Sequence, residues 1–174
     1  MSSERGPSGG AALLRDWVLA PALLLLLTAY RSPLTAQQTA FEQFRASLAT
    51  SSDTALLRAM VRRIFNGSDG PAVLSAELRA GLIGLRLGEL RADPDFSDAL
   101  SSFRRAARVS ASRPEPWYGL GLSAAARSQW EMRDPLRLGN RVGLGALERA
   151  ADYYVRALDA DPRFLPAALA LDGR

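Results

Sequence analysis

The chain has 174 residues, of which 22 are basic and 18 are acidic, so its formal net charge is +4. All of the basic residues are arginine, and lysine, histidine and cysteine do not occur. These absences exclude disulfides, thiolate nucleophiles, Ser-His-Asp triads and metal sites built on cysteine or histidine. The hydrophobic fraction of 48% suffices for the packed core of one domain.

Residues 1–36 have the pattern of an export signal. A polar segment containing Arg5 and Arg15 precedes 14 uncharged residues, from Trp17 to Tyr30. A membrane-spanning helix needs about 20 apolar residues, whereas the apolar part of a signal peptide has roughly 7–15. Because a small residue, Ala36, follows, we predict cleavage before residue 37 and export to the bacterial periplasm or cell envelope. The alternative is that residues 17–30 stay uncleaved as an inner-membrane anchor.

The next segment, residues 37–70, is predicted to be helical. Phe41, Phe44 and Leu48 recur at three- and four-residue spacing, which places them on one face of a helix. The run Ser51-Ser52-Asp53 then supplies oxygen atoms that can accept hydrogen bonds from the free amides of a second helix start. An apolar stripe follows it as far as Phe65, and the segment from residue 66 to Pro71 then breaks the helix.

Residues 71–174 continue as helices separated by turn residues. We expect helices over about 72–91, 96–109, from near 115, and over about 144–160. The acidic stretch 93–98 lacks the turn glycine and late glutamate of a calcium loop, so we interpret it as a cap formed by Asp95 or Ser97. Sustained period-two alternation is missing, and the predicted fold class is all-α.

Several of these helices share one register of small and aromatic residues. Ala150, Tyr154 and Ala157 are spaced by four and three residues, and Pro162 follows five residues later. The same spacing of small and aromatic residues occurs once upstream, and a different pattern, which begins with tryptophan, lies between the two copies. The residues of these two earlier matches are Ala99, Phe103 and Ala106, and then Trp117, Leu120 and Gly121.

This register resembles the tetratricopeptide repeat (TPR), a helical hairpin of about 34 residues. The resemblance covers residues 72–174 and is strongest over 95–124 and 146–164. It implies antiparallel helix pairs stacked as a short superhelix, with about two units and the start of a third at Phe164. We therefore expect either a terminal cap or a piece of a longer array.

Some positions depart from the repeat pattern. Glu77 and Gly84 stand where the repeat has tryptophan and tyrosine, and the turn from Glu89 to Asp98 is about six residues longer than usual. Trp117 and Ala150 are 33 positions apart, so about 17 extra residues form an insertion at 128–146.

Two candidate binding surfaces follow from the repeat phase. The insertion presents Trp130 and arginines at four-residue spacing, including Arg137 and Arg141, which suit an acidic partner. The alternative is that Trp130 only extends its helix and packs on Tyr153. The concave face would present Arg86, Tyr118 and Leu122. This groove could hold a partner's helix or peptide, the chain's own helix over 41–48, or the insertion.

The sequence contains no recognisable catalytic constellation, metal site or cofactor motif. Carboxylates at Glu115, Glu131, Asp134 and Glu148 have no predictable separation. The arginines are interleaved with acids, which argues against nucleic-acid binding. We therefore predict a non-enzymatic exported scaffold that binds a protein or peptide. The alternatives are the N-terminal scaffold of a larger enzyme or assembly, and a membrane-anchored repeat protein.

Overall fold

The computed structural model describes residues 33–67, 75–133 and 140–173. The chain divides into two compact units, residues 1–36 and 37–174. The predicted apolar segment 17–30 lies outside the described residues. The predicted cleavage position after Ala36 falls in the first turn of helix α2, which begins at Pro33. In the part of the chain that is described, no helix is both long enough and apolar enough to cross a membrane.

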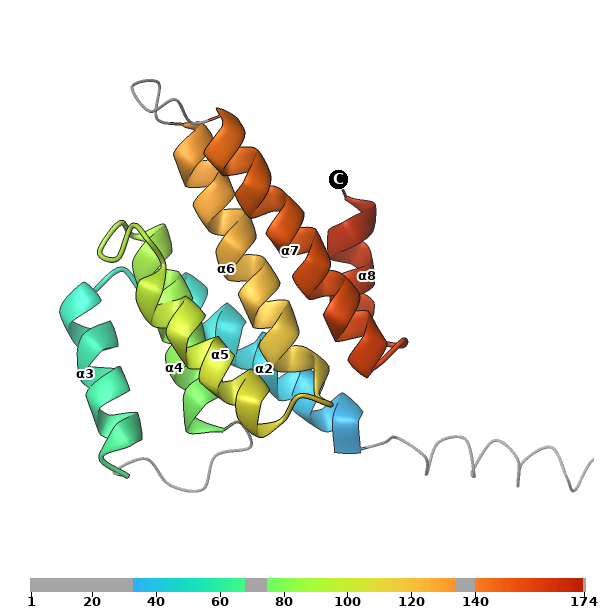
Figure 1. The fold of residues 1–174 in the computed structure, drawn as a ribbon. Coiled ribbons are helices and arrows are strands. Elements are labelled where there is room, and N and C mark those ends of the chain that lie inside the picture. The colour runs from blue at the N-terminus through green and yellow to red at the C-terminus, as the bar shows by residue number, and fades with distance from the viewer. Residues whose placement is uncertain (1–32, 68–74, 134–139, 174) are drawn as a thin grey trace, which may run out of the picture. The chain divides into compact units, whose positions relative to one another are not determined.

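The described residues form seven helices and contain no strand, so the predicted all-α class is confirmed (Figure 1). The predicted N-terminal helical segment and the predicted repeat region both lie within the second unit. The helices are α2 (Pro33–Ala49), α3 (Thr54–Phe65), α4 (Ala76–Glu89), α5 (Ser97–Val109), α6 (Pro114–Met132), α7 (Asn140–Ala160) and α8 (Leu165–Asp172).

Side-chain caps set two of the helix starts. The Asp53 carboxylate accepts hydrogen bonds from the amides of residues 55 and 56 at 2.9 and 3.0 Å, so α3 begins where the sequence predicts. The Ser75 hydroxyl accepts from the Leu78 amide at 3.3 Å, and α4 therefore begins at residue 76 instead of near 72. Both caps satisfy amides that have no partner within the helix.

Helix α5 begins at Ser97, next to the predicted start at about residue 96, but neither Asp95 nor Ser97 caps it as predicted. The Asp93 carboxylate accepts from the Asp98 amide at 2.9 Å and from the Ser97 hydroxyl at 3.1 Å. The long turn before α5 is fixed by Phe96, which adopts a left-handed backbone (φ 54°) and is buried against α4. The extra turn residues thus place a ring in the core and a carboxylate at the helix start.

Helices α4 and α5 form a close antiparallel hairpin. A Cβ added at Gly84 would lie 2.6 Å from the backbone nitrogen of Ala99, so the two backbones meet with no side chain between them. Gly84 occupies the position where the repeat pattern has tyrosine. The departure therefore has a physical reason, since a ring cannot fit where two helix backbones touch.

Rings that lie on glycines pack the helices together both within and between the two hairpins, α4–α5 and α6–α7. The Phe103 ring of α5 contacts both Gly81 of α4 and Gly119 of α6. The Tyr154 ring of α7 lies against Gly121 of α6 in the same way. Most of the pattern residues are buried, namely Ala99, Phe103, Ala106, Leu120, Gly121, Ala150, Tyr154 and Ala157.

The two remaining pattern residues lie at turns. Trp117 is half-buried, and its indole nitrogen donates to the Ala111 carbonyl at 2.8 Å across the turn between α5 and α6. Pro162 is exposed and follows the end of α7. A proline there prevents the helix from continuing, because it has no amide hydrogen.

The described residues of the insertion lengthen α6 and α7, which run side by side (Figure 1). Ser128 on α6 is buried, and its hydroxyl donates to the Gly143 carbonyl on α7 at 2.7 Å. Glu131 accepts from the Arg127 side chain at 2.8 Å, one turn away on the same helix. The insertion thus lengthens the α6–α7 hairpin, and the hydrogen bond from Ser128 to Gly143 joins the two added helix segments.

Candidate binding surfaces

Helix α2 covers the predicted concave face. Phe41 on α2 is 0% exposed, and its ring centroid lies 6.4 Å from that of Phe103 and 6.0 Å from that of Tyr118. Phe164, just before α8, reaches Tyr118 from another side, with ring centroids 5.3 Å apart. Of the occupants that the sequence left open, the chain's own helix over 41–48 lies on this face.

Tyr118 is consequently part of the core, and only 5% of its surface is exposed. Its hydroxyl accepts a hydrogen bond from Arg45 on α2 at 3.5 Å. Burial raises the pKa of Tyr118 to about 12, with a smaller contribution from the negative charge of Glu42. Tyr118 of α6 thus contacts α2 through Phe41 and Arg45, and its role in binding a partner stays a prediction.

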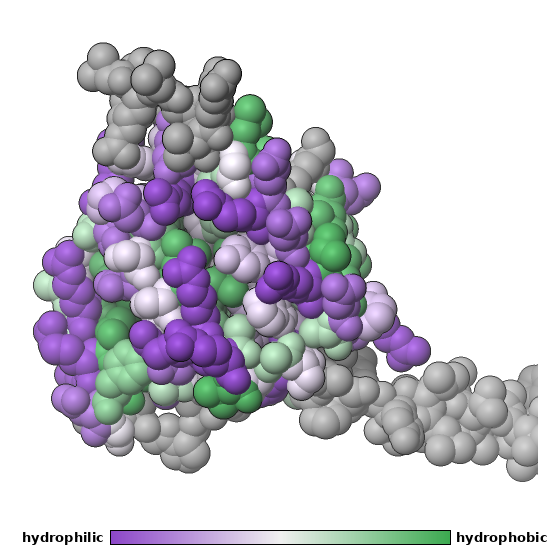
Figure 2. Space-filling view, viewed as in Figure 1, coloured by the Kyte–Doolittle hydropathy of each residue, from purple (hydrophilic) through white to green (hydrophobic). Residues whose placement is uncertain are grey.

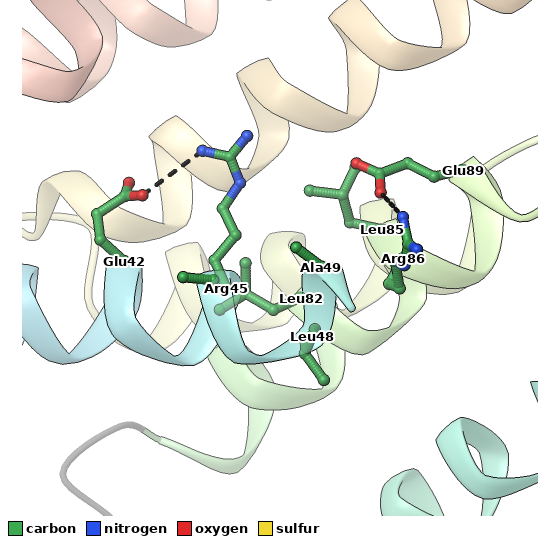
Figure 3. Close-up of a pocket in the computed structure, with 9 residues that line it drawn as sticks. Glu42, Arg45, Leu48, Ala49, Leu82, Leu85, Arg86 and Glu89 are labelled. Carbon is green, nitrogen blue, oxygen red and sulfur yellow. Dashed lines mark hydrogen bonds and ion pairs between the residues drawn. The ribbon is translucent and has the colours of Figure 1, made fainter. Parts of the chain in front are cut away.

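Arg86 is also used internally. Its Nε donates to the Ser51 carbonyl, in the connection between α2 and α3, at 3.0 Å, and its Nη1 lies 2.9 Å from Glu89. Arg86, Glu89 and the Arg45–Glu42 ion pair line a small pocket between α2 and α4, of about 280 Å³ (Figure 3). Both arginines already have carboxylate partners there.

Leu122, the third predicted groove residue, is half-buried on α6. It lines a second small pocket, of about 350 Å³, together with Arg45, Leu85 and Glu89. The two pockets share the last three residues, so they are adjacent parts of one depression beside α2. Helix α2 therefore leaves part of the predicted groove open, with a mixed polar and apolar lining.

The insertion residues are only partly described. Trp130 is half-buried in the last turn of α6, as expected if it extends that helix. Arg137 lies outside the described residues. Arg141 is in the first turn of α7, and its side chain is not among those described. Packing of Trp130 on Tyr153, and contact of these arginines with a partner, remain predictions.

A larger apolar groove lies between α2 and α8. Its volume is about 810 Å³, and Tyr118 is at its base. Leu165 and Leu169, one turn apart on α8, line it and are each 61% exposed. Gln43 and Ala46 contribute from α2. Tyr118 was among the predicted binding residues, whereas Leu165 and Leu169 were not, although leucines at i and i+4 in a C-terminal helix could have indicated an apolar face.

Of the carboxylates considered for catalysis, Glu115 and Glu131 lie on α6 and Glu148 lies on α7, while Asp134 lies outside the described residues. Glu115 is fully buried at the start of α6, and its carboxylate lies 3.8 Å from the Arg113 side chain. Burial raises the pKa of Glu115 above its ordinary value. Glu131 is buried in the lengthened part of α6, and Glu148 is exposed on α7. Within the described ranges, no three acidic side chains are placed to hold a metal ion.

Comparisons of the chain with protein-family models, with curated proteins and with solved structures find no match.

Proposed function

We propose that this protein is a TPR-like scaffold that binds another protein and has no catalytic activity of its own. The support is the packing of two helical hairpins through small residues and rings in a shared register. Gly84 against Ala99, and Gly121 against Tyr154, give this packing its close helix contacts. Repeat proteins of this architecture use their surfaces for recognition, because each added hairpin extends a rigid face.

We further propose that the partner docks in the groove between α2 and α8 as an amphipathic helix. The single observation that carries this assignment is the pair of leucines, Leu165 and Leu169, exposed on the wall of an apolar groove. The groove runs between two helices, so a third helix can lie along both. The apolar face of such a helix would cover the leucines, which is the usual mode of helix-in-groove binding.

A site-specific cross-linking experiment tests this assignment. A photo-reactive amino acid is placed at Leu169 and, as a control, at Leu56 on α3, which is also apolar and exposed at 51%. We expect one discrete cross-linked protein from Leu169 in native cells and none from Leu56. An excess of the chain without the photo-reactive amino acid should compete for the partner and suppress the cross-link. The same excess of chain carrying Leu165→Asp should not suppress it. Equal cross-linking at both positions, or suppression by the Leu165→Asp chain, would contradict the groove assignment.

Export to the bacterial cell envelope is part of the proposal. It rests on the apolar segment 17–30 and on the small residue Ala36 that follows it. Amino-terminal sequencing of the protein from native cells tests it directly. A start at residue 37 is the expected result, and an intact N-terminus in the membrane fraction would instead favour the uncleaved anchor.

A further inference from the structure

A second cleft lies between α5, the start of α6 and α7, and no residue of α2 or α8 lines it. Its volume is about 560 Å³. Aromatic and apolar side chains form its floor and arginines form its rim, and none of its lining residues is acidic. We call it the arginine cleft, and its main residues are Arg104, Arg108, Trp117, Leu120, Tyr153 and Arg156.

Two of the rim arginines lie one turn apart on α5. Arg104 and Arg108 are exposed, and neither has a carboxylate within ion-pair distance among the residues that the structure describes. The adjacent Arg105 differs, because its Nε lies 3.0 Å from both carboxylate oxygens of Glu77. The arginine pair at 104–105 is thus divided between an internal ion pair and the rim of the cleft.

The third rim arginine comes from α7 and is held by an aromatic ring. The Arg156 guanidinium lies 5.2 Å from the centre of the Trp117 ring. The hydrogen bond from Trp117 to the Ala111 carbonyl fixes that ring in turn. Asp152 and Asp159, four and three residues away on α7, form no ion pair with Arg156. The cation is therefore positioned at the cleft without being neutralised by these neighbours.

We propose that the arginine cleft binds an acidic peptide segment that carries an apolar side chain. The apolar side chain would lie on the half-buried rings of Trp117 and Tyr153, and flanking carboxylates would pair with the arginines of the rim. Arginine suits this role because its planar guanidinium binds a carboxylate through two parallel hydrogen bonds. Figure 2 shows hydrophilic side chains alternating with smaller hydrophobic areas across the face on which α5 and α7 are seen.

The shape of the cleft favours a peptide over a nucleic acid. Nucleic-acid binding requires cations along an extended track of phosphates. Here three arginines surround one pocket of about 560 Å³, which is the size of a few side chains. The net charge of only +4 on 174 residues also provides little long-range attraction for a polyanion.

A binding experiment with a defined probe tests the proposal. The probe is a fluorescein-labelled synthetic peptide of glutamates around one central phenylalanine, and binding to the chain is followed by fluorescence anisotropy. We expect Arg104→Gln/Arg108→Gln to weaken binding by about tenfold, because it removes two of the three cations that would pair with carboxylates of the peptide. The matched control is Arg62→Gln/Arg63→Gln, which makes the same change in net charge on α3 and should leave the affinity within about twofold.

Two further peptides separate the contribution of the acidic side chains to binding from that of the apolar side chain. A peptide with serines in place of the glutamates, and one with alanine in place of the phenylalanine, should each bind more weakly than the original. The proposal would be overturned if Arg104→Gln/Arg108→Gln and the control Arg62→Gln/Arg63→Gln lost the same affinity for the peptide, or if neither lost any. Tighter binding of a single-stranded oligonucleotide or of phosphatidylglycerol vesicles, lost in Arg104→Gln/Arg108→Gln alone, would overturn it as well.

The arginine cleft is separate from the groove proposed above. Leu165→Asp should leave the affinity for the glutamate peptide unchanged, because Leu165 lines the groove between α2 and α8 and does not line the arginine cleft. Failure of the peptide to bind would refute the arginine cleft while leaving the cross-link at Leu169 unaffected.

Discussion

Replacing Gly84 by alanine tests the closest approach between helix backbones in the first hairpin. The added Cβ would lie 2.6 Å from the Ala99 nitrogen, whereas ordinary contacts begin at 3.4 Å, so α4 and α5 would have to separate by about 0.8 Å. Overpacking of this kind costs about 1–3 kcal/mol. The higher helix propensity of alanine offsets up to about 1 kcal/mol. We therefore expect a net loss of up to about 3 kcal/mol in the free energy of unfolding, and a loss of about 1–3 kcal/mol relative to a helical glycine-to-alanine change that meets no neighbour.

The chain offers a matched control for this substitution. Gly145 lies in α7, and a Cβ added there would meet no atom within 4 Å. Gly145→Ala should therefore gain about 0.5–1 kcal/mol from helix propensity alone. Urea unfolding followed by circular dichroism measures the free energy of unfolding of both variants. The comparison is made where both show the same dependence of that free energy on urea concentration. If Gly84→Ala is as stable as Gly145→Ala, the two backbones do not meet at Ala99, and the close packing of α4 on α5 is incorrect.

Two further predictions concern buried ionisable groups. Because the folded-state pKa of Glu115 is raised, stability should fall as the pH rises through the range above 4.5. Glu115→Gln should therefore raise the free energy of unfolding at pH 7, and raise it by less near pH 4. Urea unfolding at the two pH values measures this, and a lower free energy of unfolding at pH 7 would contradict the prediction. Tyr118 should stay protonated at about pH 11, since its pKa is about 12. Tyr118→Phe should thus leave the tyrosinate absorbance of the folded chain unchanged at that pH, but lower that of the urea-unfolded chain by about a quarter, because the chain has four tyrosines.

Local sequence patterns predicted the helices well where caps and apolar spacing agree. The start of α3 at Asp53 follows from a carboxylate that reaches amides two and three residues ahead. The start of α5 near residue 96 was also predicted correctly, but its capping residue was not, because the carboxylate that accepts there is Asp93. Asp93 reaches the Asp98 amide only because Phe96 folds into the core and bends the turn back. Spacing alone cannot show that bend.

The candidate sites were harder to predict, because each depends on what lies across from it. The repeat phase placed Tyr118 and Arg86 on one face, but it did not show that Phe41 covers the first and the Ser51 carbonyl binds the second. It also gave no means of telling Arg104 from Arg105. Only the position of Glu77, 28 residues earlier in the sequence, separates the two.

The sequence by itself determined that the chain is helical and that small residues alternate with rings in one register, because both properties arise from neighbours within about one helical turn or from a regular repeat. The tertiary structure alone decided which surfaces remain open. Helix α2 occupies most of the predicted concave face, while apolar leucines stay exposed on α8 and the arginines at 104 and 108 of α5 stay apart from every described carboxylate. Exposure depends on contacts between residues that are distant in the sequence, and no local pattern contains that information.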